Sequence, residues 1–113
     1  MAIIYKILTQ ALWNEAQAAG ELTGAPVDLK DGYIHFSTAD TVRETAARHF
    51  RDQPDLVLVA VDAGRLGPEL RWEPSRGGAL FPHLYARMPL AAVLWSRPLP
   101  LGADGAHAFP DLA

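Results

Sequence analysis

Side chains suited to binding or catalysis gather in three short stretches of this sequence: DGYIHFST at 31–38, RWEPSRGG at 71–78 and FPHLY at 81–85. Imidazole, hydroxyl and carboxylate groups can hold sugar hydroxyls or move protons, and arginine can neutralise a phosphate. If the three stretches meet in space, they predict a polar ligand site. The candidate residues are Tyr33, His35, Ser37, Thr38, Arg71, Trp72, Glu73, Arg76, His83 and Tyr85.

The first stretch has the alternation of a strand. Successive side chains of a strand point to opposite faces, so Tyr33, His35 and Ser37 share one face while Ile34 and Phe36 share the other. One face is therefore apolar and suited to a core. The other is either solvated or the wall of a cleft.

A helix is expected directly after this strand, over 39–50, with Ser37 and Thr38 supplying N-cap oxygens. A helix N-terminus presents unpaired N–H groups and attracts phosphate. Together with His35, this arrangement would suit a ribose and its phosphate.

The second stretch alternates in the same way. Arg71 and Glu73 are expected on one face of a strand, opposite Leu70 and Trp72. Such a pair is either a surface ion pair of little energetic value or part of a site. Because catalytic groups often lie where an element ends, Glu73 is a catalytic candidate together with His35.

In the third stretch, His83 and Tyr85 lie two residues apart, while Pro82 argues against a regular central strand. A metal site made of His35, His83 and Glu73 lacks local ligand spacing, so we expect no metal. A Ser-His-Glu hydrolase triad lacks the G-x-S-x-G elbow. The sequence also has no phosphate-binding loop and no dinucleotide fingerprint.

The elements that position these stretches predict an α+β fold, because strands outnumber helices and do not alternate strictly with them. Thr9 and Gly20 are expected to cap the first helix, and residues 21–32 to form a loop. The run 55–62 is apolar enough to be a central strand buried on both faces. Strands are predicted at 3–8, 55–62, 70–73, 80–87 and 92–97, and helices at 10–19 and 39–50.

With 113 residues, half of them hydrophobic and a fifth charged, the chain is expected to form a single domain over 1–113. Its core should span about 3–97, and residues 100–113 should form a loosely packed tail.

The formal charge is −3 and no run of Lys or Arg occurs, which argues against nonspecific nucleic-acid or anionic-membrane partners. The absence of cysteine excludes thiol catalysis, disulfides and thiolate metal sites. Neither a signal peptide nor an apolar run of about 18 residues is present, so we expect a cytoplasmic protein. We also expect a monomer.

The three stretches resemble the domain of unknown function 952 family of small bacterial proteins. The resemblance covers about residues 3–97 and includes Thr45 and Ala46 in addition to the three motifs. The family name itself implies no activity.

IHFST also resembles the histidine-glycine-serine/threonine strand of ADP-ribosyltransferases, which implies a split sheet around a ligand cleft with two main helices. The resemblance implies that His35 holds a ribose hydroxyl of NAD, that Ser37 holds the nicotinamide amide and that Glu73 stabilises the oxocarbenium-like ribose. Phe36 stands where the glycine is expected.

The resemblance therefore implies a protein that binds NAD or an ADP-ribose-like nucleotide, with transferase or glycohydrolase activity on it. NAD would be a substrate, and no cofactor is assigned. Two alternatives remain open: a non-catalytic module that uses the same cleft, or an interaction protein in which the tyrosines and histidines pack together.

Overall fold

The computed structural model describes residues 2–112, except for the side chain of Arg76, and its fold is α+β with antiparallel sheets, as predicted. Its helices are α1 (Gln10–Ala19), α2 (Pro26–Asp31) and α3 (Val42–His49). Its strands are β1 (Ile3–Thr9), β2 (Glu21–Leu22), β3 (Ile34–His35), β4 (Leu56–Asp62), β5 (Leu70–Pro74), β6 (Leu80–Leu84), β7 (Met88–Pro89) and β8 (Val93–Leu99).

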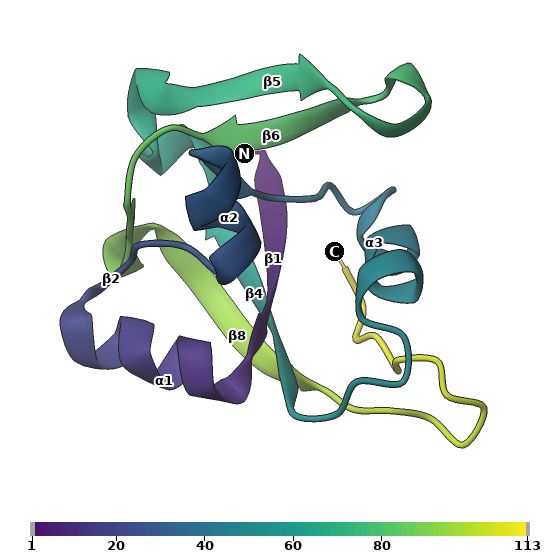
Figure 1. The fold of residues 1–113 in the computed structure, drawn as a ribbon. Coiled ribbons are helices and arrows are strands. Elements are labelled where there is room, and N and C mark those ends of the chain that lie inside the picture. Colours follow the sequence, from purple (N-terminus) through teal and green to yellow (C-terminus); the bar gives the residue numbers. More distant parts are fainter. Residues whose placement is uncertain (1, 113) are drawn as a thin grey trace.

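The strands form two three-stranded sheets and one short pair. The first sheet has the order β1-β4-β8 and the second the order β3-β6-β5, while β2 pairs with β7. All pairings are antiparallel. In Figure 1 the hairpin of β5 and β6 crosses one end of the first sheet.

The prediction that 55–62 forms a buried central strand is confirmed by β4, which pairs with β1 on one side and β8 on the other. Alternate residues of β4 enter two separate cores, because successive side chains face opposite ways. Val57, Val59 and Val61 join a core that includes Trp13 and Ala16 of α1. Leu56, Leu58 and Ala60 join a core that includes Val42 and Ala46 of α3.

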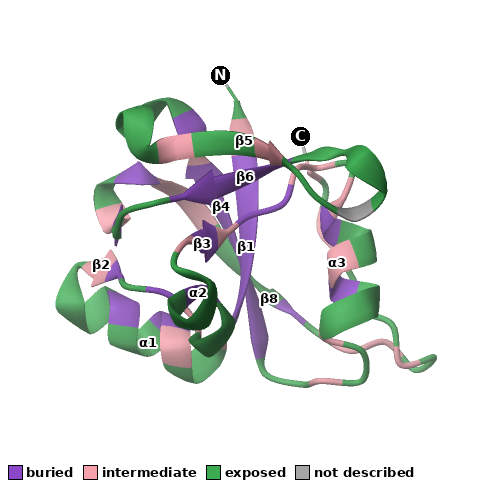
Figure 2. Cartoon of the chain, turned by 45° about the horizontal axis from the view of Figure 1, so that its top comes forward, coloured by how far each residue is buried: buried purple, intermediate pink, exposed green. Residues whose placement is uncertain are grey.

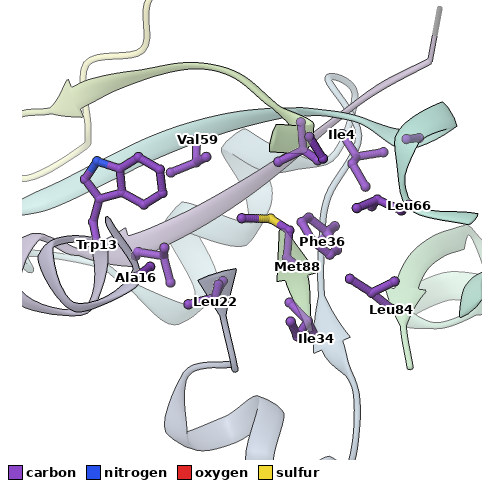
Figure 3. Close-up of a cluster of buried hydrophobic side chains, with 14 of the residues drawn as sticks. Ile4, Trp13, Ala16, Leu22, Ile34, Phe36, Val59, Leu66, Leu84 and Met88 are labelled. Carbon is purple, nitrogen blue, oxygen red and sulfur yellow. The ribbon is translucent and has the colours of Figure 1, made fainter. Parts of the chain in front are cut away.

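The two helices therefore cover opposite faces of this sheet (Figure 1). Figure 3 shows the first core, in which Phe36 lies near Met88, Ile34 and Leu84. In Figure 2, β1 and β6 are buried along most of their length while the outer sides of the helices are exposed.

Helix α1 begins and ends where the sequence indicates. The Thr9 side chain accepts a hydrogen bond from the Leu12 amide at 3.2 Å, and Gly20 ends the helix with a left-handed φ of 81°. These caps fix α1 at the end of β1.

Residues 21–32 are not the simple loop that was predicted, because they contain β2 and α2, so the described chain has three α-helices instead of two main ones. Pro26 opens α2 and Gly32 closes it with φ 88°. The helix is only six residues long, and its stability comes from tertiary contacts of Asp28 that no sequence periodicity reveals.

Pro82 lies in the central strand of the second sheet, contrary to the expectation that it would prevent a regular ladder there. The N–H and C=O groups of one strand residue point to the same side, and the Pro82 carbonyl accepts from the Phe36 amide at 3.0 Å. The missing proline N–H therefore faces the side on which β3 has already ended after His35.

The segment 34–37 joins the two sheets. Ile34 and His35 pair with β6, whereas Ser37 exchanges two backbone hydrogen bonds of 2.8 Å with Tyr5 of β1. This strand-like stretch thus changes from one sheet to the other within four residues.

Helix α3 begins at Val42, three residues later than predicted. The Thr38 carbonyl accepts hydrogen bonds from the amides of Thr41 and Val42, so residues 38–41 form a turn that separates Ser37 from the helix. The cap residue is Thr41, and the side-chain oxygens of Ser37 and Thr38 contact Thr45 and Thr41, so the prediction that Ser37 and Thr38 supply the N-cap oxygens is wrong.

Residues after Leu99, for which a loose tail was expected, make contacts with the body of the protein. Phe109 and Leu112 pack against the second core, and a ring nitrogen of His107 lies 2.8 Å from the carbonyl oxygen of Gln53. Over residues 2–112, no helix is long and apolar enough to cross a membrane.

Candidate functional site

A cavity of about 720 Å³ lies beside β1, whose residues 5–9 all line it. The opposite walls come from α2, β3, β6 and α3. Its lining includes six polar or aromatic side chains of interest: Lys6, Asp31, Tyr33, His35, Ser37 and His83.

Asp28, on α2, connects Lys6 and His35, two residues of the cavity lining, through its buried carboxylate. Its carboxylate is 1% exposed and forms an ion pair with Lys6 Nζ, at 3.0 Å from Oδ1 and 2.9 Å from Oδ2. Oδ1 also accepts from the His35 amide and lies 2.7 Å from His35 Nδ1, and Oδ2 accepts from the Ala25 amide. Lys6 Nζ in turn donates to the His35 carbonyl at 2.8 Å.

These partners keep the carboxyl group of Asp28 ionised. Burial raises the pKa of its carboxyl, but the hydrogen bond with His35 and the charge of Lys6 outweigh burial and bring the pKa down to about 2. Burial lowers the pKa of Lys6, and Asp28 opposes this decrease. The pair therefore anchors α2 to β1 and fixes the ring of His35.

His35 lies between two carboxylates. Asp28 is on Nδ1, and Asp31 Oδ2 lies 3.1 Å from Nε2. The ring can donate to both carboxylates only when both nitrogens carry protons. Asp31 is the outer partner, with a side chain that is 40% exposed.

His83 has a carboxylate partner of its own. Its Nδ1 lies 2.9 Å from Oε1 of Glu73, and the hydroxyl of Tyr85 donates to the same oxygen at 2.7 Å. Hydrogen bonds from Tyr85 and His83 lower the pKa of Glu73, and the bond to Glu73 raises the pKa of Tyr85. Glu73 is therefore ionised at neutral pH and shared by two donors.

Tyr33 connects the two histidines. Its ring centroid lies 4.5 Å from that of His35, 4.3 Å from that of His83 and 5.1 Å from that of Tyr85. The three sequence stretches therefore meet in space, as the predicted site requires. Tyr33 and His35 come from the first stretch, Glu73 from the second, and His83 and Tyr85 from the third.

Not every predicted site residue joins this group. As the alternation indicated, Arg71 is on the face of Glu73, and its guanidinium lies 5.0 Å from the ring centroid of Tyr85. Trp72 pairs with Pro82 on the opposite face of β5, is 43% exposed and does not line the cavity, so its ligand contact stays a prediction from the sequence. The side chain of Arg76 lies outside the described residues.

The hydroxyl groups of Ser37 and Thr38, which were predicted to bind a ligand, each contact another hydroxyl group of the protein. Ser37 Oγ lines the cavity, is buried and lies 2.9 Å from Thr45 Oγ1. Thr38 Oγ1 lies 3.1 Å from Thr41 Oγ1 and is not part of the cavity wall. No group of three metal-ligand side chains occurs in the described part of the chain.

Sequence reasoning missed Lys6, Asp28 and Asp31. Lys6 did carry a signal, because it is a lone cation within the apolar strand IIYKIL and must be paired if it is buried there. Asp28 and Asp31 carried none, because in the sequence both look like ordinary charges of a polar loop.

The fold and the site define an α+β protein in which two three-stranded antiparallel sheets, joined by a histidine-bearing segment, flank a cavity with two carboxylate-bound histidines. Residues 7–96 match the model of the family described as Protein of unknown function (DUF952), and the chain belongs to this family. The family expected from the sequence motifs is thus confirmed.

The chain is similar to solved structures of protein CC0527 from Caulobacter crescentus. A crystal structure of it is 50% identical, covers 94% of this chain and 93% of its own, and gives a TM-score of 0.91. The solution NMR structure is 51% identical, with coverages of 94% and 91% and a TM-score of 0.83. The search of curated proteins gave no match.

Proposed function

We propose that this chain binds NAD or an ADP-ribose-like nucleotide in the cavity beside β1. The observation that carries the proposal is the meeting of His35 and His83, each oriented by a carboxylate, on the wall of a cavity of about 720 Å³. This volume lies within the range of small-molecule sites. Histidines oriented in this way suit the hydroxyl groups of a ribose.

The aromatic groups of the site support a ligand with a flat ring. Tyr33 lines the cavity, and Tyr85 adjoins it. Such rings stack on a base or on nicotinamide. Arg71, beside Tyr85, would neutralise a phosphate, and Arg76 stays a candidate for the same role on sequence grounds.

We further propose a relationship to the ADP-ribosyltransferase fold. Its support is the division of the sheet structure into two parts, with the histidine segment running from one part to the other beside the cavity. In this proposal Glu73 stabilises positive charge at the anomeric carbon, which requires an ionised carboxylate. The lowered pKa of Glu73 agrees with that role.

The binding proposal is tested by following the amide NMR signals while NAD or ADP-ribose is added. We expect shifts at Tyr33, His35 and His83, and about tenfold weaker binding by His83→Gln because a hydrogen bond to the ligand is lost. His107→Gln is the matched control, because His107 lies outside this cavity. Unchanged signals at millimolar ligand would refute the proposal.

Turnover is tested separately by measuring nicotinamide release from NAD. Release that is abolished by Glu73→Gln supports an enzyme. Binding without release supports the non-catalytic module. If His35→Ala lowers stability while no ligand binds, the residues serve packing alone.

A further inference from the structure

The two carboxylates that contact His35, those of Asp28 and Asp31, differ in how much hydrogen-bond acceptor capacity remains for a ligand. Asp28 is buried, and both of its oxygens are used by Lys6, the Ala25 amide and His35 itself. Asp31 is 40% exposed, lines the cavity and contacts Nε2 of His35 through Oδ2. A carboxylate has about four acceptor positions, so Asp31 keeps capacity for further donors.

Asp28 also determines which ring nitrogen of His35 contacts Asp31. By holding Nδ1 at 2.7 Å, it orients the imidazole so that Nε2 points to Asp31, away from the buried ion pair. Asp31 Oδ2 and His35 Nε2, 3.1 Å apart, therefore form a polar pair on the cavity wall that two adjacent hydroxyls of one sugar can reach together.

Asp31 is the acidic residue among the described side chains that line this cavity. The charge of Asp28 is offset by the buried Lys6, which leaves Asp31 as a carboxylate whose partner is the imidazole of His35. On the other side of Tyr33, His83 is likewise bound to a carboxylate, that of Glu73. A carboxylate accepts hydrogen bonds from hydroxyls and repels a phosphate at the same position.

We propose that Asp31 and His35 together grip the cis-diol of the ribose that carries the adenine, that the second ribose lies toward His83 and Glu73, and that Asp31 excludes an adenosine ribose carrying a phosphate on either hydroxyl. This inference rests on the proposed nucleotide function and narrows its ligand class to nucleotides such as NAD or ADP-ribose, in preference to their 2′-phosphorylated forms. Asp31 is the residue that determines this specificity.

The test compares ADP-ribose with ADP-ribose 2′-phosphate by calorimetric titration of the wild-type chain and of Asp31→Asn. We expect the wild type to prefer ADP-ribose by at least about tenfold, and Asp31→Asn to reduce this preference to about threefold or less. Asp31→Glu, which restores the charge, should recover it.

Asp40→Asn is the matched control, because it removes the same charge from an exposed residue outside the cavity wall. It should keep the wild-type preference. Amide shifts at Tyr33 and His35 confirm that each titration reports on this cavity.

The inference is overturned if the wild type binds both ligands equally, or if Asp31→Asn retains the wild-type preference, while ADP-ribose still shifts the amides of the cavity. In either case the proposed nucleotide function survives. If the wild type binds neither compound, the proposed function fails and the inference fails with it.

Discussion

At the scale of single residues, the strongest prediction for the free energy of unfolding concerns the buried ion pair of Lys6 and Asp28. Asp28→Asn would leave the ammonium of Lys6 buried without a counter-charge, so we expect the free energy of unfolding to fall by about 3–5 kcal/mol. The exposed Asp31→Asn should change it by no more than about 1 kcal/mol. Urea titrations of the two variants check this, and equal losses would contradict the assignment of Asp28 as the anchor.

The same residue predicts a dependence of stability on pH. The pKa of Asp28 is about 2 in the folded protein, below the 3.8 of a free side chain. From about pH 5, well above the unfolded pKa, both states are ionised and the full contribution of about 2 kcal/mol is present. It is lost as the pH falls through the folded pKa, because the unfolded state takes up the proton first.

Unfolding curves at intervals between pH 5 and pH 2 measure this loss. In Asp28→Asn the corresponding part of the pH dependence should be absent. A variant that loses stability over this range as steeply as the wild type would show that other carboxyl groups are responsible.

At the scale of elements, α2 depends on a close approach at Gly24. Gly24 has a φ of 133°, and a Cβ there would lie 2.9 Å from Cβ of Asp28. Gly24→Ala should therefore lower the free energy of unfolding by about 1–3 kcal/mol and displace Asp28.

Gly20→Ala is the comparison, because Gly20 also has a positive φ but no atom lies within 4 Å of an added Cβ. It should be the milder change in thermal unfolding. In addition, only Gly24→Ala should shift the amide signal of His35, which donates to Asp28. Identical effects of the two variants would argue against a steric role for Gly24.

At the scale of the whole molecule, segment 34–37 joins the two sheets and places Phe36 in the core between them. We expect the chain to unfold as one unit, so that tryptophan fluorescence and far-ultraviolet circular dichroism give the same transition. Phe36→Ala should lower the free energy of unfolding by about 3–5 kcal/mol without separating the two signals.

Leu80→Ala, at a position that is 55% exposed, is the control and should change stability by about 0.5 kcal/mol or less. Two separate transitions in the wild type would mean that the sheets are independent units. That result would also contradict the expectation of a single domain over 1–113.

The alternation of YIHFS and of LRWE was enough to predict which side chains share a face, because the period of a strand depends only on local geometry. Local capping by Thr9 and Gly20 likewise gave the bounds of α1. Helix α2 was missed, since a six-residue helix held by Asp28 has no repeating pattern to detect.

By itself, the sequence determined the α+β class, the buried central strand β4, the family and the three stretches from which the site is built. The tertiary structure decided that Glu73 binds His83, that Trp72 lies on the opposite face, and that Asp28 and Lys6 meet across 22 positions of the chain. The reason is physical: alternation and capping act between neighbours in the chain, whereas ion pairs and shared cavities depend on distances that only the folded chain sets.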